Sequence, residues 1–310
     1  MPNYTKETIR FRSSDGKTPV AAFFYSPAGT PKAIIQLCHG MVEYVGRYEP
    51  MIDVLCGAGY AVCGNDHLGH GHTGKKEDWG FFAEKNGSEY VLGDLHRMNI
   101  LGRNEWPGLP LILLGHSMGS FFARWFAEKH PDALDALVIS GTGGPGAVIG
   151  AGRAMAEALT ALKGPRYVSG FMAKAAMGGY TKGIEDPRSS SVWLSRDPAV
   201  WAAYDADPMC TFPFTVSAFR DMLTVLGHVN SAAWFRSLRK DLPVYLYSGT
   251  MDPVGDYGKG VTKVYEELVR AGMQNVTIKL YPEGRHEMHN ELNKEEVFSD
   301  LIGWCQNALA

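Results

Sequence analysis

Long hydrophobic runs, basic clusters and a secretory leader are all missing from this 310-residue sequence. No apolar stretch approaches the 18 or more residues that a membrane-spanning helix requires. Lysine and arginine (30 residues) are balanced by aspartate and glutamate (33), which gives a net charge of −3, so no nucleic-acid partner is predicted. The first ten residues are polar, and we therefore expect no signal peptide.

Cysteine is also scarce, and its spacing indicates no pairing. The five cysteines are scattered, odd in number, and form no CxxC pair. Such a set is typical of reduced, buried thiols and favours a cytoplasmic protein. The glycine-rich segment from Gly141 to Gly152 has neither GxGxxG nor Walker spacing. It gives no support for a phosphate-bearing cofactor, and we predict no cofactor.

Short apolar runs alternate with helical patterns along much of the chain. Continuous apolar runs of this kind are typical of strands that are buried on both faces. The runs are Ala33–Cys38, Tyr60–Gly64, Leu109–Leu114, Leu134–Ser140, Leu242–Ser248 and Val276–Tyr281. Near the N-terminus, Ser13-Ser14-Asp15-Gly16 is a hairpin signal between two further strands, Thr8–Phe11 and Val20–Tyr25. The alternation predicts an α/β fold with a mostly parallel sheet.

This rhythm is interrupted once, after Ser140. From Thr142 to about Arg236 the sequence shows several helical stretches and no convincing strand, and the strand–helix alternation then resumes. We therefore expect a core whose N-terminal part spans 1–141 and whose C-terminal part spans 237–310. Residues 142–236 are the predicted helical cap or lid insertion.

Gly115-His116-Ser117-Met118-Gly119 fits the pattern G-x-S-x-G. The bare pattern is weak, because glycine and serine are common, but here a strand enters it and a helix leaves it, as a nucleophile elbow requires. The small residues on either side permit a strained turn. The start of the helix offers N–H groups to a developing oxyanion. Ser117 is the predicted nucleophile.

A serine nucleophile needs a base, and the base needs a carboxylate that orients it. Asp252 follows the strand at 242–248, and His286 follows the strand at 276–281. Both loops lie at carboxyl ends of strands, where open α/β sheets place their sites. The chain order serine, aspartate, histidine is the one expected after such an elbow. Asp252 and His286 are therefore the predicted partners of the serine.

Other residues compete for these roles. Asp256 lies four residues beyond Asp252 but further from the strand end, and His289 lies close to His286. His39 is a further candidate base, although it precedes the serine and belongs to another motif. The sequence leaves these three residues as alternative candidates.

The segment Cys38-His39-Gly40-Met41 ends the first predicted parallel strand. In folds with a nucleophile elbow, the loop at this place supplies one oxyanion N–H, and the residue after the nucleophile supplies the other. The backbone N–H groups of Met41 and Met118 are the predicted donors. An ordinary glycine turn after a strand is the alternative interpretation.

Two histidine groups raise the possibility of a metal. His286 and His289 with Glu287 or Glu291 lack helical ligand spacing and a matching third site. The loop Asp66–Thr73 holds three histidines, but its interleaved glycines favour a structural loop. No metal is predicted.

Apolar side chains recur through the insertion. If they are exposed, they would form an acyl-chain tunnel or a membrane-docking face, and if they are buried, they are the cap's own small core. They are Met155, Leu159, Leu162, Val168, Phe171, Met172 and Met177. If they are exposed, transient membrane contact through the cap is expected.

Taken together, these motifs resemble the monoacylglycerol lipase and lysophospholipase branch of the α/β-hydrolases, from Phe11 to Glu291. The resemblance is carried by His39-Gly40-Met41-Val42-Glu43-Tyr44-Val45-Gly46-Arg47-Tyr48, Asp66–Thr73, Gly115–Gly119, Asp197-Pro198 through Asp207-Pro208, Arg285-His286-Glu287 and Asn290-Glu291. One departure is Tyr44, where the family commonly has histidine.

The resemblance implies the α/β-hydrolase fold, with a mostly parallel eight-stranded sheet, flanking helices and a helical cap. It places Ser117, Asp252 and His286 at the triad positions, and Met41 and Met118 at the oxyanion donors. The implied activity is hydrolysis of monoacylglycerol, lysophospholipid or similar acyl esters through an acyl-enzyme. An amidase or aminopeptidase, an acyltransferase and a catalytically inactive ligand-binding receptor are the alternatives. The expected partner is a small acyl ester, lipids included, and no oligomeric state is predicted.

Overall fold

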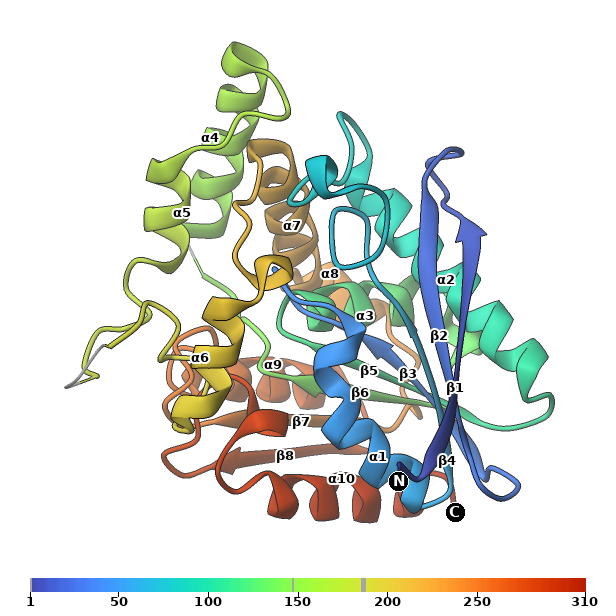
Figure 1. Ribbon diagram of the computed structural model, residues 1–310. Coiled ribbons are helices and arrows are strands. Elements are labelled where there is room, and N and C mark those ends of the chain that lie inside the picture. Colours follow the sequence, from blue (N-terminus) through green and yellow to red (C-terminus); the bar gives the residue numbers. More distant parts are fainter. Residues whose placement is uncertain (1, 147, 185–187) are drawn as a thin grey trace.

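A single sheet of eight strands forms the centre of the protein (Figure 1). The computed structural model describes residues 2–146, 148–184 and 188–310. The strands are β1 (Tyr4–Arg12), β2 (Pro19–Pro27), β3 (Ala33–Cys38), β4 (Tyr60–Asn65), β5 (Leu111–His116), β6 (Ala136–Ser140), β7 (Val244–Gly249) and β8 (Val276–Tyr281). Their order in the sheet is β1-β2-β4-β3-β5-β6-β7-β8. β2 pairs antiparallel with β1 and β4, and the other pairings of the described strands are parallel. The predicted α/β fold with a mostly parallel eight-stranded sheet is confirmed.

The burial of each strand follows its sequence. Every residue of β3, β4, β5, β6 and β7 is buried, as the continuous apolar runs indicate. The outer strands differ, because most residues of β1 are exposed and β8 is only partly buried. The charged side chains that β1 carries at this edge hinder pairing with another chain.

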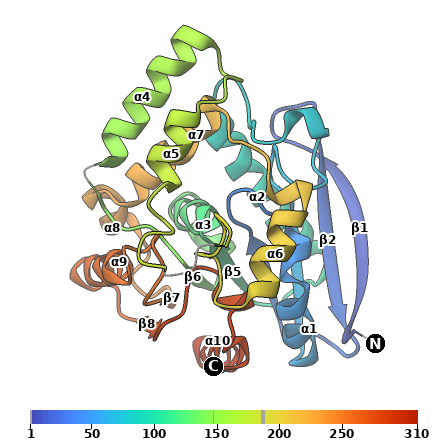
Figure 2. The ribbon, with the colours of Figure 1, turned by 60° about the vertical axis from the view of Figure 1, so that its left-hand side comes forward.

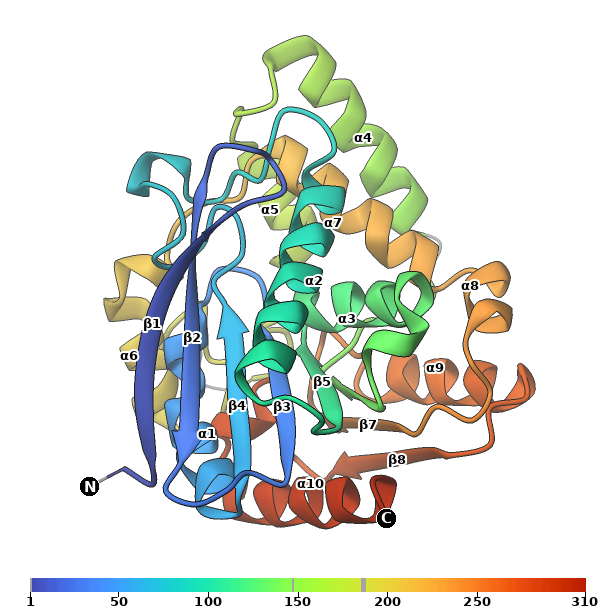
Figure 3. The same ribbon diagram turned by 90° about the vertical axis from the view of Figure 1, so that its right-hand side faces the viewer.

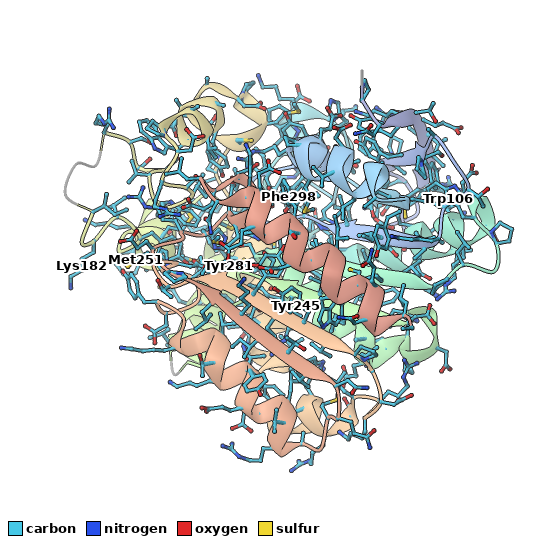
Figure 4. The ribbon with its side chains drawn as sticks, turned by 90° about the horizontal axis from the view of Figure 1, so that it is seen from below. Trp106, Lys182, Tyr245, Met251, Tyr281 and Phe298 are labelled. Atoms are coloured by element: carbon cyan, nitrogen blue, oxygen red, sulfur yellow. The ribbon has the colours of Figure 1, made fainter. Side chains whose placement is uncertain are left out.

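Helices cover both faces of the sheet. On one face lie α1 (Glu49–Gly57) and α10 (Lys294–Ala308), side by side in front of the strands in Figure 4, where Phe298 marks α10. On the other lie α2 (Gly87–Glu105), α3 (Met118–Lys129) and α9 (Lys259–Arg270), with α2 in front of the sheet in Figure 3. Two separate clusters of buried apolar side chains fill these two layers. Short 3-10 helices add η1 (Val45–Tyr48), η2 (Lys76–Asp78), η3 (Pro131–Ala133), η4 (Pro208–Cys210) and η5 (Met288–Asn290).

The strand order creates a crevice between β3 and β5. From β3 the chain moves outward to β4, whereas from β5 it moves in the opposite direction to β6. At such a reversal, the loops after the two strands separate and leave room for a ligand at their carboxyl ends. The loop after β3 begins with His39 and Gly40, and the turn after β5 carries Ser117. The fold therefore brings together the two segments that the sequence marks out.

The stretch between β6 and β7 is helical, as predicted. It contains α4 (Val148–Lys163), α5 (Gly170–Met177), α6 (Pro198–Ala206), α7 (Val216–Val229) and α8 (Ala232–Ser237). Its described residues form one isolated bridge, between Val168 and Thr215, and no strand. α4 packs along α7, which in turn packs on α3, so their buried side chains join the same apolar cluster as the sheet. No described helix is long and apolar enough to cross a membrane.

One buried arginine connects α3 to the segments before α4 and after α7. The guanidinium of Arg124 donates hydrogen bonds to the carbonyl oxygen of Gly143 (3.3 Å) and to Oδ1 of Asn230 (3.0 Å), and it lies over the ring of Trp234. Gly143 precedes α4, and Asn230 follows α7. Burial lowers the pKa of Arg124 to about 9, and its carbonyl partners compensate part of the cost of burying the charge. The same side chain thus ties the segment before α4 and the segment after α7 to α3.

Close packing of α3 against β3 depends on Gly119. A methyl group at this position would overlap the carbonyl oxygens of Cys38 and His39. We expect Gly119→Ala to lower the free energy of unfolding by about 3 kcal/mol or more, because the backbone there has no room to move. The matched control is Gly303→Ala on α10, where the added methyl meets open space and should stabilise the helix by about 0.5–1 kcal/mol. Equal urea midpoints for the two variants would contradict this account.

Candidate active site

Ser117 occupies a sharp turn between β5 and α3. Its φ is 52° and its ψ −123°, a left-handed conformation that is strained for any residue other than glycine. The turn is held by hydrogen bonds from Ser117 N to the carbonyl oxygen of Ser140 (2.9 Å) and from the Ser120 hydroxyl to the carbonyl oxygen of Ser117 (2.6 Å). Ser117 is partly exposed, whereas Met118 and Gly119 behind it are buried. The strand–turn–helix context predicted for this serine is present.

Asp252 and His286 meet although 34 residues separate them. The distance from His286 Nδ1 to Asp252 Oδ1 is 2.9 Å, and both side chains are almost fully buried. Asp252 also accepts hydrogen bonds from the Ser248 hydroxyl and from the N–H of Val254, both at 2.9 Å. These donors fix the carboxylate, which in turn sets the orientation of the imidazole.

Aromatic groups enclose the imidazole of His286. The ring of Trp193, from the stretch between β6 and β7, lies 4.9 Å from it, and the ring of His116 lies 4.6 Å away. Gly141 packs so closely that an added methyl would lie 3.1 Å from Cε1 of His286. Burial by itself lowers the pKa of His286, but the Asp252 carboxylate outweighs it, and the pKa is raised above the ordinary histidine value.

The loop after β3 lies directly against the serine. A methyl group added at Gly40 would lie 3.1 Å from Cβ of Ser117, so glycine is needed for this approach. The next residue, Met41, lines the same cavity as Ser117 and His286, and so does Met118. The structure therefore brings four of the five predicted site residues to one cavity, with Asp252 directly behind His286.

The competing residues have other surroundings. Nδ1 of His39 donates to the carbonyl oxygen of Gly40 (2.8 Å), while its Nε2 accepts from the N–H of His67 (2.9 Å), so both ring nitrogens are engaged by the backbone. His289 stacks on Tyr48, with ring centroids 4.4 Å apart, and burial lowers its pKa to about 4. Asp256 lines the cavity, but the described hydrogen bond of His286 goes to Asp252. The geometry favours His286 and Asp252.

The histidine-rich loop is held together by Asp66. Its carboxylate accepts hydrogen bonds from the N–H groups of Val45 (2.9 Å) and His72 (2.8 Å). His67 and His70 are fully buried, and burial lowers their pKa to about 3 and about 4. Across residues 2–146, 148–184 and 188–310, no group of three or more His, Cys, Asp or Glu side chains is arranged to hold a metal.

A buried ionic cluster beside the site was not assigned a role from the sequence. Arg47 forms two hydrogen bonds with Glu287 (2.5 and 2.8 Å) and one with Glu43 (3.2 Å). Glu287 directly follows His286, so the cluster joins the histidine loop to the loop after β3. Arg47 lowers the pKa of Glu287 despite burial, whereas burial raises the pKa of Glu43. The four-residue spacing of Glu43 and Arg47 was a visible signal, but their pairing with Glu287 depends on the fold.

The cavity above Ser117 has a volume of about 1130 Å³. In Figure 2, α4, α5 and α6 surround α3, which is seen end-on. The walls of this cavity include apolar side chains from α3, α4, α5 and α7. They are Phe121, Val148, Ile149, Met155, Phe171, Met172, Phe219, Met222, Leu223 and Leu226. Some of the apolar residues predicted for the insertion are buried and others are exposed: Met172 is buried, whereas Leu162 and Phe171 are 78% and 70% exposed.

The five cysteines, predicted to be reduced and buried, are all free and buried.

A family model for serine aminopeptidase, S33, matches residues 29–293. The chain belongs to this family. It is therefore a serine hydrolase, and the resemblance to monoacylglycerol lipases noted from its motifs is confirmed by its relatives.

Several relatives match almost the whole chain. A monoacylglycerol lipase from Mycolicibacterium smegmatis is 29% identical over 288 residues, which cover 92% of each chain. The monoglyceride lipase of Homo sapiens is 28% identical over 300 residues, covering 93% of this chain and 86% of the human one. Among solved structures, a carboxyl esterase from Bacillus coagulans in complex with glycerol has a TM-score of 0.93 at 30% identity, and 99% of both chains is covered.

The raised pKa of His286 predicts the pH dependence of turnover. A histidine base acts only when it is neutral, so kcat/KM should fall as the pH drops through this pKa. Because Asp252 raises it, with smaller contributions from Glu287 and Glu43, the acid limb should have its midpoint above 6.5. The measurement is kcat/KM for a short p-nitrophenyl ester between about pH 5 and 8.

Asp252→Asn serves as the comparison. Once the carboxylate charge is removed, burial alone lowers the pKa of His286. The acid limb should therefore move to lower pH, while kcat falls by about 10⁴-fold. A wild-type midpoint at or below 6.5, or an unchanged limb in the variant, would contradict the assignment.

Proposed function

We propose that the protein is a carboxylic-ester hydrolase that forms an acyl-enzyme on Ser117. The observation that carries this proposal is the Asp252–His286 hydrogen bond at the base of a cavity that also contains the strained Ser117 turn. A serine on such a turn has its hydroxyl exposed at the carboxyl edge of the sheet. A buried carboxylate holds the histidine in the tautomer that leaves Nε2 free to act as a base.

In the proposed reaction, His286 removes the proton of the Ser117 hydroxyl as its oxygen attacks the ester carbonyl carbon. Asp252 stabilises the imidazolium that forms. The imidazolium then gives its proton to the departing alcohol, which leaves an acyl group on Ser117. Water, activated by the same histidine, hydrolyses this acyl-enzyme and regenerates the serine.

The developing oxyanion is assigned to two backbone N–H groups. Met118 is the first residue of α3, so its N–H lies at the positive end of the helix dipole. Met41 follows Gly40, which lies against Ser117. In comparable enzymes one such donor contributes about 3 kcal/mol to the transition state. No cofactor is required for this chemistry.

The substrate that fits best is a monoacyl ester with an apolar chain. Ligand pockets for small molecules typically have volumes of about 300–1,000 Å³, so a cavity of about 1130 Å³ is large enough for a lipid monoester. Met155, Met222 and Leu226 offer apolar walls to an acyl chain, whereas Glu43 and Glu287 offer polar groups nearer the site. Monoacylglycerols, lysophospholipids and similar acyl esters likewise have an apolar chain and a polar head group. The relatives named lipase or esterase support this substrate class.

The same triad would cleave amides, and the family description names aminopeptidases. An acyltransferase would differ only in the alcohol that accepts the acyl group. The apolar walls of the cavity favour an acyl chain over a charged amino terminus.

Ser117→Ala should reduce hydrolysis of p-nitrophenyl esters by at least about 10⁴-fold, because the attacking oxygen is removed. The activity panel compares p-nitrophenyl esters of increasing chain length with amino-acid anilides. We expect the wild type to prefer esters and to reject the anilides. An unchanged rate in Ser117→Ala would overturn the assignment of the nucleophile, and a preference for anilides would favour the aminopeptidase.

We also propose that residues 142–236 act as a cap that contacts lipid surfaces transiently. The supporting observation is the exposure of Leu162 at the end of α4 and of Phe171 on α5, the outermost helices in Figure 1. Exposed apolar side chains on neighbouring helices gain free energy when they enter an interface between water and lipid. Such contact would bring the cavity to a substrate that resides in the membrane.

Replacing Leu162 and Phe171 together by serine should lower the fraction of protein that cosediments with phosphatidylcholine vesicles, by about threefold or more. Ile100→Ser on α2 removes a side chain that is 47% exposed but lies outside the cap, and should leave cosedimentation unchanged. Equal losses in both variants would show that the contact is not specific to the cap.

A further inference from the structure

Val42 has a backbone conformation that its side chain disfavours. Its φ is 57°, in the left-handed region, where a β-branched residue is a clear outlier. Such a conformation costs about 1–3 kcal/mol and persists only where the surroundings hold it. Val42 follows Met41, the proposed oxyanion donor, so a contact that holds Val42 also restricts the backbone of Met41.

Val42 is buried in the apolar core cluster, and its carbonyl oxygen is held from the insertion. The hydroxyl of Tyr204, on α6, donates to the carbonyl oxygen of Val42 at 3.0 Å. These residues are 162 positions apart in the chain, so only the seating of α6 brings them together. A second contact lies beside it, because the hydroxyl of Tyr44 donates to Oδ2 of Asp207 at 2.8 Å. The loop after β3 is thus tied to the insertion at two places.

Tyr204 itself is held in place from the other side. The guanidinium of Arg47 lies over its ring, 4.8 Å from the centroid. Arg47 has little freedom, because both oxygens of Glu287 accept its hydrogen bonds. The ring is therefore packed against a fixed planar group, and its hydroxyl has a defined direction toward Val42.

The other end of the loop is anchored within the core. Gly40 N donates to Oε1 of Glu43, and the carbonyl oxygen of Gly40 accepts from Nδ1 of His39 at 2.8 Å. Met41 therefore lies between two anchored residues, Gly40 on the core side and Val42 on the insertion side. Of these anchors, the one at Val42 is supplied by the insertion.

We propose that Tyr204 is a positioning residue, which holds the Met41 N–H toward the oxyanion through its hydrogen bond to the carbonyl oxygen of Val42. This inference rests on the proposed function of Met41 as a donor. It makes α6 part of the frame that stabilises the transition state, in addition to its place in the cavity wall. A cap that is displaced at α6 would leave this oxyanion donor less well aligned.

Tyr204→Phe removes only the hydroxyl and keeps the ring on Arg47. With a short p-nitrophenyl ester we expect kcat to fall by about tenfold, less than the 10²–10³-fold lost when a donor is removed outright, with KM changed by less than about twofold. The affinity for an alkyl trifluoromethyl ketone, whose adduct with the serine carries an oxyanion, should fall by the same factor as kcat/KM. A purely structural role would not move these quantities together.

The control is Tyr167→Phe, which removes the hydroxyl of a cap tyrosine that is 41% exposed and does not line the cavity. It should leave kcat and ketone affinity unchanged. Unaltered values in Tyr204→Phe as well would overturn the inference.

Hydrogen–deuterium exchange tests the same inference without substrate. The peptide that covers residues 39–47 should exchange faster in Tyr204→Phe than in the wild type or in Tyr167→Phe. Unchanged exchange would overturn the inference, as would faster exchange with unaltered kcat. Failure of the proposed function is distinguishable, because it appears as absent ester hydrolysis in the wild type.

Discussion

At Ser117 the chain leaves β5 and enters α3 with a φ of 52°, a conformation that only tight packing around the turn can maintain. Gly119 lets α3 approach the end of β3, and Gly40 lets the loop after β3 approach Ser117. The same close approach places the start of α3, with its free N–H groups, beside the loop that carries Met41. The strained turn is therefore the constraint on which the arrangement of the proposed nucleophile and the proposed oxyanion donors depends.

Around this turn, three segments that are distant in the sequence are connected by buried polar contacts. The Asp252–His286 pair lies behind the serine, and Arg47 joins Glu287 of the histidine loop to Glu43 of the loop after β3. Removing one partner from such a buried ionic cluster leaves an uncompensated charge, so the cluster keeps the two loops in a fixed relation. Contacts from α6 extend the same network into the insertion. The loops of the proposed site and the insertion are thus joined by shared contacts.

The sheet and the candidate triad were predictable because their signals are local. Fully buried strands read as continuous apolar runs, and G-x-S-x-G between a strand and a helix has a definite geometric meaning. The limits of β1 were less predictable: the strand spans Tyr4–Arg12, beyond the predicted Thr8–Phe11, because its first part, Thr5-Lys6-Glu7, is a polar run with no apolar signal. Tyr204 could not be predicted as a partner of Val42, because that contact depends on how α6 packs against the loop after β3. No local sequence pattern encodes this packing.

The central claim is that Ser117 is the nucleophile, activated by His286. It is tested most directly by treating the protein with a fluorophosphonate and mapping the modified peptide by mass spectrometry. The account predicts one adduct, on Ser117, formed rapidly by the wild type and very slowly by His286→Ala, because the hydroxyl then lacks its base. An adduct on another residue, or equal labelling rates for the two proteins, would contradict it.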